Sequence, residues 1–297
     1  MKTKIKYLIS ALIIGVVFTI SSCSKDEELP KIDGFNNSNE VAATNLKAHW
    51  TFDDNNNEVI SSTAPSKTYG TVGSETGQIG KALKLTAGAL VYPSISAIGQ
   101  ANSLPNYTVS MWLFAKNNGN AFSTFFGLFP TANTDFWGNI NLSAETGWFP
   151  ANGPEGDTLV FKTDYVSLNS NNSLNAQNNR PDPKGNPAVG VFKNAGKWCH
   201  YVVRFTASTH KLEIFGNGVS IGAYNDRGAN TIEMNMRNPV QAVFGSLATS
   251  EVGFAGAPIR PDWQVLATAS IDDVRLFDTA LSQVEITALF NLGTAGR

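Results

Sequence analysis

The feature that most constrains the fold of this chain is strict alternation between apolar and mixed side chains in short segments. It is clearest in residues 107–116 ("YTVSMWLFAK") and 198–207 ("WCHYVVRFTA"). The mainly apolar faces are Tyr107, Val109, Met111 and Leu113 in the first segment and Cys199, Tyr201, Val203 and Phe205 in the second. Because successive side chains of a strand point to opposite faces, each segment predicts a strand with one face for a core and one for other contacts.

Further segments of this kind predict an all-β chain. Gly, Asn and Pro clusters separate them, and these residues favour turns between strands. The additional strands expected are residues 46–52, 81–92, 121–129, 158–168 and 240–246, with a hairpin over 211–224 ("KLEIFGNGVSIGAY"). A series of short alternating strands is typical of an antiparallel two-sheet sandwich.

Helical periodicity is confined to the C-terminus. Ser282, followed three residues later by Glu285, forms a capping-box pattern that marks a helix start. The apolar stripe after it consists of Val284, Ile286, Leu289 and Phe290. Gly293 is expected to end the helix, because glycine readily adopts the conformation of a C-terminal cap. The pattern therefore predicts one short C-terminal helix.

The N-terminus has the pattern of a secretory signal. Three lysines precede a short apolar run, residues 8–20, which is too short and wrongly flanked for a spanning helix. Residues 20–23 ("ISSC") resemble the lipobox of bacterial lipoproteins, in which the cysteine is lipidated and becomes the new N-terminus. Residues 1–22 are therefore expected to be a signal peptide and Cys23 the lipidation site. The alternative is a chance cysteine after an ordinary signal.

The residues that follow Cys23 indicate a surface anchor. Residues 24–28 ("SKDEE") resemble the export signal with which one group of Gram-negative bacteria displays lipoproteins on the outer face of the outer membrane; a plain charged tether is the alternative. Residues 23–45 are polar without a sustained period, so they are expected to be the lipidated cysteine and a flexible linker. These features predict an outer-membrane lipoprotein that faces the extracellular side.

Charge and cysteine content exclude two classes of protein. The formal net charge changes from −2 to −5 when the three lysines of the signal are removed, and no basic block is present. Nucleic-acid binding needs clustered Lys and Arg, so nucleic acid is excluded as a partner. With Cys23 lipidated, Cys199 has no partner cysteine, which excludes a disulfide framework.

The region from about 130 to 195 interrupts the regular pattern. Within it, residues 169–186 ("NSNNSLNAQNNRPDPKGN") are rich in Asn and Pro. Such a stretch is expected to be a long surface excursion rather than a strand, and long ordered loops often carry binding specificity. Disorder without a role is the competing interpretation.

Five blocks in order carry a family resemblance: "AHWTFDDN", "GQIGKALKLTAGALVYP", "NYTVSMWLFAK", "GKWCHYVVRFTASTHKLEIFGNG" and "SIDDVRLFDTALSQVEITALFNLG". Together they resemble the laminin G-like, concanavalin A-like jelly-roll family, over residues 46–297 except the insertion around 130–195. The resemblance implies two antiparallel sheets of six or seven strands each, one convex and one concave. It also implies that the two ends of the chain lie close together.

The family resemblance also implies a structural calcium ion at the rim. The matching ligands are Asp53 or Asp54, Asp272 and a backbone carbonyl near Gly88, and hard oxygen donors of this kind suit calcium. Asp272 shares the alternation of Val274 and Leu276, which predicts that it points inward and needs a cation. Alternatively, these aspartates form turns or pair with a basic residue such as Arg275. Asp273, of opposite alternation, is expected to pair with Arg275.

Relatives that bind carbohydrate hold sugar on the concave face or in rim loops. Trp137, Trp148 and Trp263 lie in Gly- and Pro-rich surroundings and are the candidates for exposed stacking platforms, since sugar C–H faces pack on aromatic rings. Trp112 and Arg204 lie on the non-core face of expected strands and are candidates for the groove floor. For each of them, a side chain packed structurally onto the sheet is the alternative.

Catalytic patterns are incomplete. Glu155-Gly-Asp157 resembles the paired-carboxylate motif of laminarinase-like hydrolases but lacks its third acid, and Cys199 alternates onto the core face. The sequence therefore favours non-catalytic polysaccharide binding, with glycan-import proteins as neighbours. One alternative is a glycoside hydrolase or lyase that uses Glu155, Asp157 and His200. The other is a protein-binding adhesion module.

Overall fold

The computed structural model describes residues 29–100, 103–119, 121–130, 136–168, 174–178, 184, 188–225, 235–239 and 241–297. The chain divides into two compact units, Met1–Pro30 and Lys31–Arg297, of which the second is the folded domain. Its described part consists of β-strands, short 3-10 helices and one α-helix, α1 (Gln283–Thr294). The 3-10 helices are η1 (Ser38–Glu40), η2 (Ala43–Asn45), η3 (Ala207–Thr209) and η4 (Ser250–Val252).

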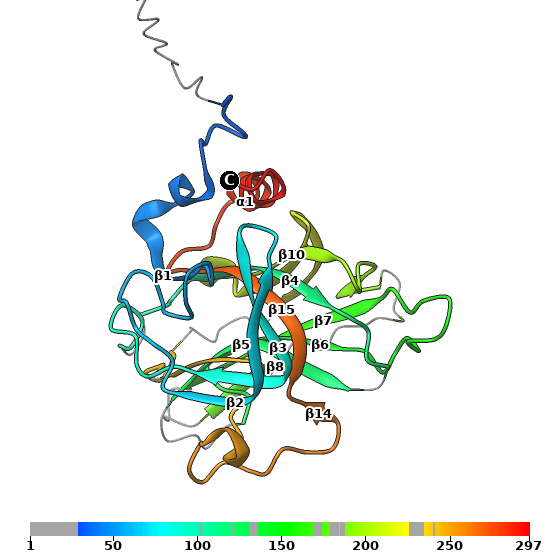
Figure 1. The fold of residues 1–297 in the computed structure, drawn as a ribbon. Helices are drawn as coiled ribbons and strands as arrows, with labels where there is room; N and C mark the ends of the chain where they lie inside the picture. Colours follow the sequence, from blue (N-terminus) through cyan, green and yellow to red (C-terminus); the bar gives the residue numbers. More distant parts are fainter. Residues whose placement is uncertain are drawn as a thin grey trace, which may run out of the picture. The chain divides into compact units, whose positions relative to one another are not determined.

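One layer of the domain is an antiparallel sheet built on long central strands (Figure 1). In spatial order its strands are β12 (Val219–Asn225), β11 (Lys211–Gly216), β10 (Trp198–Thr206), β4 (Tyr107–Ala115), β15 (Ala267–Phe277) and β3 (Lys81–Val91), with β1 (Leu46–Trp50) beside β15 and β2 (Lys67–Thr76) beside β3. The two segments with the clearest alternation are β4 and β10, which are paired in this sheet.

The second layer continues from the far end of β3. Its strands, in order, are β13 (Gln241–Phe244), β5 (Phe122–Phe129), β6 (Ile140–Glu145), β7 (Leu159–Leu168) and β8 (Leu174–Asn178), with β14 (Gln264–Val265) beside β5 and β9 (Val191–Phe192) beside β7. All pairs are antiparallel except β14 with β5. Because β3 pairs with β15 along most of its length and with β13 at Leu90 and Val91, hydrogen bonds connect the two layers.

Aromatic contacts pack the two layers face to face. Tyr201 of β10 stacks on Phe161 of β7 at a centroid distance of 3.9 Å, and its hydroxyl donates to the Lys162 carbonyl at 2.7 Å. Trp50 of β1 makes edge contacts with Phe126 of β5 at 5.6 Å. Buried aromatic area of this size is a main source of core stability. The expected all-β, two-sheet jelly-roll sandwich with one C-terminal helix is confirmed.

The expected insertion is part of the second sheet. Residues 130–195 include β6, β7 and β9, and Leu174–Asn178 within the Asn-rich stretch forms β8 instead of a surface excursion. Apart from Lys184, the rest of 169–186 lies outside the described residues. The sequence did not indicate β2, because this edge strand has few buried side chains and so lacks an apolar face.

A β-bulge in β15 changes the expected direction of Asp272. Ile271 and Val274 both belong to the sandwich core, and the register with β4 shifts after Asp272. Asp273 has φ of 44°, which is unusual for a residue with a side chain. The bulge turns both aspartates to the outer face of the sheet, so the inward direction predicted for Asp272 is wrong.

The helix α1 covers the outer face of β10 and β15. Ser282 caps it with the expected capping box, while Val284 is 64% exposed and so does not belong to the buried stripe. Gly293 does not end the helix. It lies against Trp112, where a Cβ atom would overlap the indole ring.

The folded domain begins at Lys31 and not at Leu46. Arg275 donates to the Ser38 carbonyl at 3.2 Å and to its hydroxyl at 2.9 Å, and Val41 is 1% exposed in the core beneath α1. Residues 31–45, expected to belong to a flexible linker, are therefore packed on the sheet by an apolar contact and a buried arginine.

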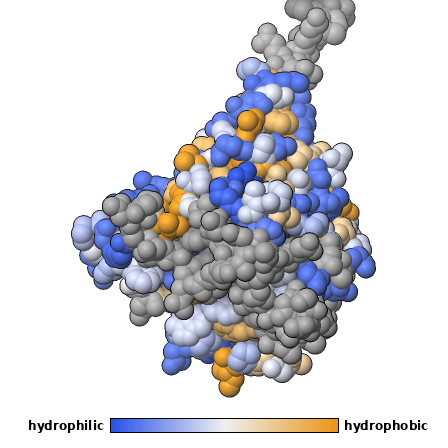
Figure 2. All heavy atoms as spheres, turned by 180° about the vertical axis from the view of Figure 1, so that it is seen from behind, coloured by the Kyte–Doolittle hydropathy of each residue, from blue (hydrophilic) through white to orange (hydrophobic). Residues whose placement is uncertain are grey.

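The described surface of the domain carries scattered large apolar side chains. On the face opposite to that of Figure 1, apolar and polar residues alternate in small patches (Figure 2). The exposed large apolar residues of the domain are Val59, Ile60, Trp148, Val219, Ile259, Trp263 and Val284.

Candidate ligand-binding site

A cluster of aromatic rings lies at the start of β5. Trp137 and Trp263 are stacked, with centroids 5.8 Å apart and an interplanar angle of 19°, and Phe122 makes edge contacts with both. Local pairing explains the arrangement: β14 pairs with the beginning of β5, and the Phe122 N–H donates to the Trp263 carbonyl at 2.8 Å. Two tryptophans far apart in sequence therefore form one rigid unit.

A hollow of about 410 Å³ opens beside this cluster, and we call it the tryptophan hollow. Trp263 lines it together with Trp148, and these two side chains are 45% and 47% exposed. Phe122 and Glu145 also line it. The three tryptophans proposed as platforms are thus brought together: two face the hollow and Trp137 supports one of them from behind.

A partly buried ion pair connects the hollow to the second sheet. Lys162 of β7 is 5% exposed, and its Nζ lies 2.9 Å from Glu145 Oε1. The same ammonium lies 5.2 Å from the ring centroid of Phe122 and 5.1 Å from that of Trp137. Cation–π contacts of this kind are strongest where water is excluded. The positive charge is therefore stabilised on several sides.

Glu145 links this ion pair to an exposed ring. Its Oε2 accepts a hydrogen bond from the Trp148 indole N–H at 3.2 Å, while its Oε1 binds Lys162. One carboxylate thus orients an exposed platform and neutralises a buried amine. No sequence pattern indicated Glu145 or Lys162 as site residues. Each is one polar residue on the outer face of a strand, and only the register of β6 with β7 brings them together.

Trp112 and Arg204 are not part of this hollow. Trp112 is 3% exposed and stacks against Phe290 of α1, so the helix covers the ring. Arg204 donates to the Glu213 carboxylate and, at 2.7 Å, to the Leu281 carbonyl. Both side chains hold elements together on the outer face of the first sheet, as the alternative interpretation of these residues expected.

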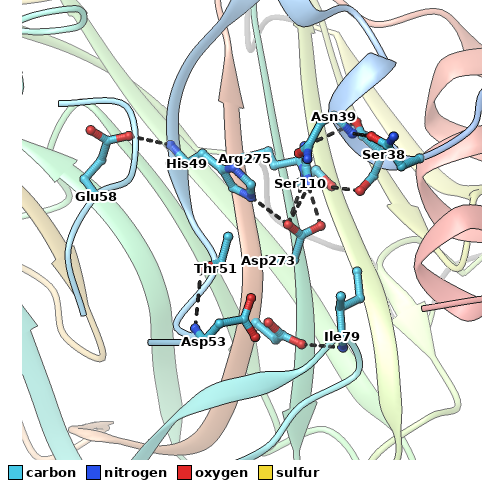
Figure 3. A network of polar contacts seen from close by, with 12 residues as sticks. Ser38, Asn39, His49, Thr51, Asp53, Glu58, Ile79, Ser110, Asp273 and Arg275 are labelled. Carbon is cyan, nitrogen blue, oxygen red and sulfur yellow. Dashed lines mark hydrogen bonds and ion pairs between the residues drawn. The ribbon is translucent and has the colours of Figure 1, made fainter. Parts of the chain in front are cut away.

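The aspartates expected at a calcium site lie beside the turn between β2 and β3. The N–H of Lys81 donates to Asp53 Oδ1 and that of Ile79 to Asp272 Oδ2, each at 2.8 Å. Asp53 and Ile79 are labelled in Figure 3. The turn is so close that a Cβ atom on Gly80 would overlap Asp53 Oδ1. Asp53 and Asp272 are thus held by one turn.

Asp54 and Gly88 lie apart from this pair of carboxylates. Asp54 is exposed and lines a separate small hollow with Glu58. Gly88 of β3 pairs with Ala267 of β15, whereas Leu83 of β3 pairs with Ile271, the residue before Asp272. Gly88 therefore lies about 15 Å along the strand from the position beside Asp272. A carbonyl ligand for this pair would come from another part of the chain.

Asp272 has one oxygen without a hydrogen-bond partner, and no ion pair with a described basic residue. It is fully buried, and its Oδ1 makes no hydrogen bond. Burial raises its pKa to about 7, and the negative charges of Asp273 and Asp53 act in the same direction. The described residues hold no cluster of three or more His, Cys, Asp or Glu suited to a metal, so a cation here would use two carboxylates and backbone carbonyls. Calcium accepts such a donor set.

Asp273 is paired as expected. Its carboxylate lies 2.9 Å from Arg275 Nη2 and 2.7 Å from His49 Nε2 (Figure 3). Although burial alone would raise its pKa, Arg275 and His49 hold the pKa of this carboxyl below its ordinary value. This network lies on the same outer face that carries Ser38.

The residues of the catalytic alternative do not converge. His200 is 1% exposed, its Nε2 lies 2.8 Å from the Ser110 hydroxyl, and burial lowers its pKa to about 3. Glu155 and Asp157 lie in the turn before β7, in the other layer. Cys199 is buried, and burial raises its pKa to about 12, as expected of a structural thiol.

The residues of the expected anchor lie outside the described residues. These are the signal peptide 1–22, Cys23 and the acidic residues after it. Within the described part of the chain, no helix has the length and apolar character needed to cross a membrane.

The described elements form a β-sandwich domain. No protein-family model matches the chain, and no curated protein matches it in sequence. Among solved structures, the chain resembles domain 4 of AbnA, a GH43 extracellular arabinanase from Geobacillus stearothermophilus, in complex with arabinotriose. The TM-score is 0.51 at 19% identity, over 82% of this chain and 98% of that one.

Two toxin structures have a similar fold. The binding domain of Paraclostridial Mosquitocidal Protein 1 has a TM-score of 0.53 at 13% identity, over 84% of this chain and 52% of that one. A botulinum neurotoxin type C structure, described as depending on two ganglioside molecules for cell entry, has a TM-score of 0.52 at 14% identity, over 84% and 51%. The chain spans about half the length of these toxin chains. The likeness shows a fold shared with sugar- and receptor-binding domains.

Proposed function

We propose that this protein is a non-catalytic carbohydrate-binding module that holds a polysaccharide in the tryptophan hollow. The observation that carries the proposal is the pair of half-exposed rings, Trp148 and Trp263, on one hollow with the Glu145 carboxylate in its wall. Indole faces stack on the C–H faces of a sugar ring, and a carboxylate accepts hydrogen bonds from its hydroxyls. The arabinotriose complex of the AbnA domain supports the proposal.

The proposed location is the outer face of the outer membrane, with Cys23 as lipid anchor. The apolar run, the "ISSC" pattern and the acidic residues after it support this location. An anchored module of this kind would keep glycan close to neighbouring import proteins. Cys23→Ala is expected to release the protein from the membrane fraction, and a variant that stays membrane-bound would contradict the anchor.

Affinity electrophoresis on gels that contain a panel of polysaccharides tests the binding function. At least one glycan is expected to retard the protein. Trp148→Ala and Trp263→Ala are each expected to weaken binding about fivefold or more, since a buried aromatic contact contributes about 1 kcal/mol or more. Trp198→Ala is the matched control, because this half-buried tryptophan pairs with Phe114, away from the hollow. Absence of retardation on every glycan, or release of sugar products from the retarding one, would contradict the proposal.

We also propose that a structural calcium ion binds between Asp53 and Asp272. The support is the fully buried Asp272, whose Oδ1 has no hydrogen-bond partner, beside a second carboxylate on the same turn. A cation would satisfy the unpaired oxygen and remove the cost of burying the charge. Asp54 and Gly88, which the family resemblance also implied, are not included in the proposed site, because Asp54 lines a separate hollow and Gly88 lies about 15 Å along β3.

Thermal melting with and without a chelator, at several pH values, tests the calcium site. In chelator, the pKa of Asp272 is about 7 in the folded state and 3.8 in the unfolded chain. The folded state then binds more protons, so the free energy of unfolding is expected to fall as pH rises from 4 to 7, by up to about 1.4 kcal/mol per unit. Added calcium is expected to restore the free energy of unfolding above pH 7, where Asp272 is charged. At pH 5, where Asp272 is protonated in the folded state, calcium is expected to have little effect.

Asp272→Asn provides the control for this experiment. It removes the titrating group, so both the pH-dependent loss and the response to calcium are expected to disappear. If calcium does not change the melting midpoint of the unaltered protein at any pH, the calcium site is contradicted. Asp272 would then be a buried carboxylic acid that is kept protonated.

A further inference from the structure

A second hollow of about 380 Å³ lies between the ends of the two sheets, and we call it the inter-sheet pocket. Ala115 of β4, Phe125 of β5 and Leu159 of β7 line it, and all three belong to the sandwich core. Lys116 and Thr268 lie at its exposed rim. The pocket therefore leads from solvent to the apolar end of the core.

Small side chains create this space. Ala115 and Ala144 occupy core positions at the ends of their strands, and Ala87 and Ala121 also line the pocket. Interiors are otherwise packed as densely as organic crystals, so apolar core surface left open in a hollow of this size is costly. A concave, mainly apolar pocket with a few polar groups at its rim is the usual character of a site for a small apolar group.

The inter-sheet pocket and the tryptophan hollow adjoin each other. Ala121 and Thr146 line both of them. These two residues are joined directly, since the N–H and the hydroxyl of Thr146 donate to the Ala121 carbonyl at 3.3 Å and 3.1 Å. The two hollows thus share this residue pair as a common border.

We propose that the inter-sheet pocket is a subsite for an apolar substituent of the bound saccharide, either an aryl group or an acyl chain. This inference rests on the proposed function, because it places the sugar ring in the tryptophan hollow. The two hollows differ in chemistry as the two parts of such a ligand do: indole faces and a carboxylate for the sugar, and alanine, leucine and phenylalanine side chains for the substituent. The pocket is large enough for an aromatic ring, because cavities of about 150 Å³ hold benzene.

Calorimetric titration with matched glycosides tests the subsite. Methyl, 4-nitrophenyl and octyl glycosides of glucose, galactose, xylose and arabinose serve as probes. For the sugar that binds, the 4-nitrophenyl or the octyl glycoside is expected to bind about tenfold or more tightly than the methyl glycoside, because it buries additional apolar area. A larger gain for 4-nitrophenyl indicates an aryl ligand, and a larger gain for octyl indicates an acyl chain.

Two variants locate the gain in the pocket. Ala144→Met fills the floor and is expected to reduce the affinity for substituted glycosides to that for the methyl glycoside, which should not change. Val265→Phe narrows the pocket from a half-buried position at its edge and tests the same point if Ala144→Met does not fold. Val219→Phe, at an exposed position of β12, is the matched control and should leave every affinity unchanged.

The possible outcomes separate this inference from the proposed function. Equal affinity for methyl and substituted glycosides, or a gain that persists in both filled variants, overturns the subsite and leaves sugar binding intact. Failure of every glycoside and polysaccharide to bind overturns both. Binding of 4-nitrophenol alone that Trp148→Ala does not weaken and Ala144→Met abolishes supports the pocket but overturns its link to a saccharide.

Discussion

At the scale of single residues, Lys162 organises the candidate site. Its ammonium is almost fully removed from water, and such a charge is costly unless it is paired. Glu145 and the faces of Phe122 and Trp137 offset that cost. Because Glu145 also accepts from Trp148, the position of an exposed platform depends on a buried charge.

Replacing Glu145 with Gln is expected to lower the free energy of unfolding by about 2 kcal/mol, because Lys162 loses its carboxylate. The loss should be smaller than for a fully buried pair, since the Glu145 side chain is 29% exposed. Lys162→Met, added to Glu145→Gln, is expected to recover part of it. Urea unfolding of the two single variants and the double variant measures the coupling, and an unchanged urea midpoint for Glu145→Gln would contradict it.

At the scale of elements, α1 determines which face of the sandwich is open to ligands. It lies on the outer face of the first sheet, where Phe290 covers Trp112 and His200. Gly293 allows this close approach, because its backbone lies against the Trp112 ring. The aromatic and polar residues of that face are thus used for packing, and the accessible tryptophans lie at the second sheet.

Gly293→Ala is expected to reduce the free energy of unfolding by about 1–3 kcal/mol, because the new methyl group overlaps Trp112 in a packed interface. Helix propensity alone predicts the opposite, a gain of about 1 kcal/mol for alanine. Thr294→Ala, at the exposed neighbouring position, is the control and should be close to neutral. Chemical denaturation distinguishes steric overlap from helix propensity. A Gly293→Ala variant that is more stable than the original protein would contradict the overlap and show that α1 can move away from the sheet.

At the scale of the whole domain, the N-terminal segment 31–45 completes the fold. Val41 extends the core beneath α1, and the Ser38 N–H donates to the Arg297 carbonyl at 3.3 Å. Both ends of the domain are thereby fastened to the same face, consistent with the adjacent chain ends expected from the family resemblance.

A chain that begins at Leu46 is expected to melt at least about 5 °C below one that begins at Lys31. Loss of Val41 exposes apolar surface, and Arg275 loses two acceptors on Ser38. Val41→Ala in the longer chain should reproduce part of the difference. Equal melting midpoints for the two chains would show that this segment adds nothing to stability.

Much of the fold could be predicted because its signals are local. The alternation in β4, the alternation in β10 and the Ser282 capping box each depend on a few adjacent residues. The structure has all three where they were expected. Edge strand β2 was missed, since a strand with few buried side chains has no apolar pattern. The three platform tryptophans could be named from their irregular surroundings, while their role in binding stays a prediction.

By itself, the sequence determined the fold class, the C-terminal helix and the tryptophan candidates. The tertiary structure decided what depends on contacts between distant residues. The register of β6 with β7 joins Glu145 to Lys162, and the bulge in β15 turns Asp272 outward. Periodicity follows from the geometry of one strand, whereas register, bulges and close approaches are set by the partner strand or helix, which no short stretch of sequence specifies.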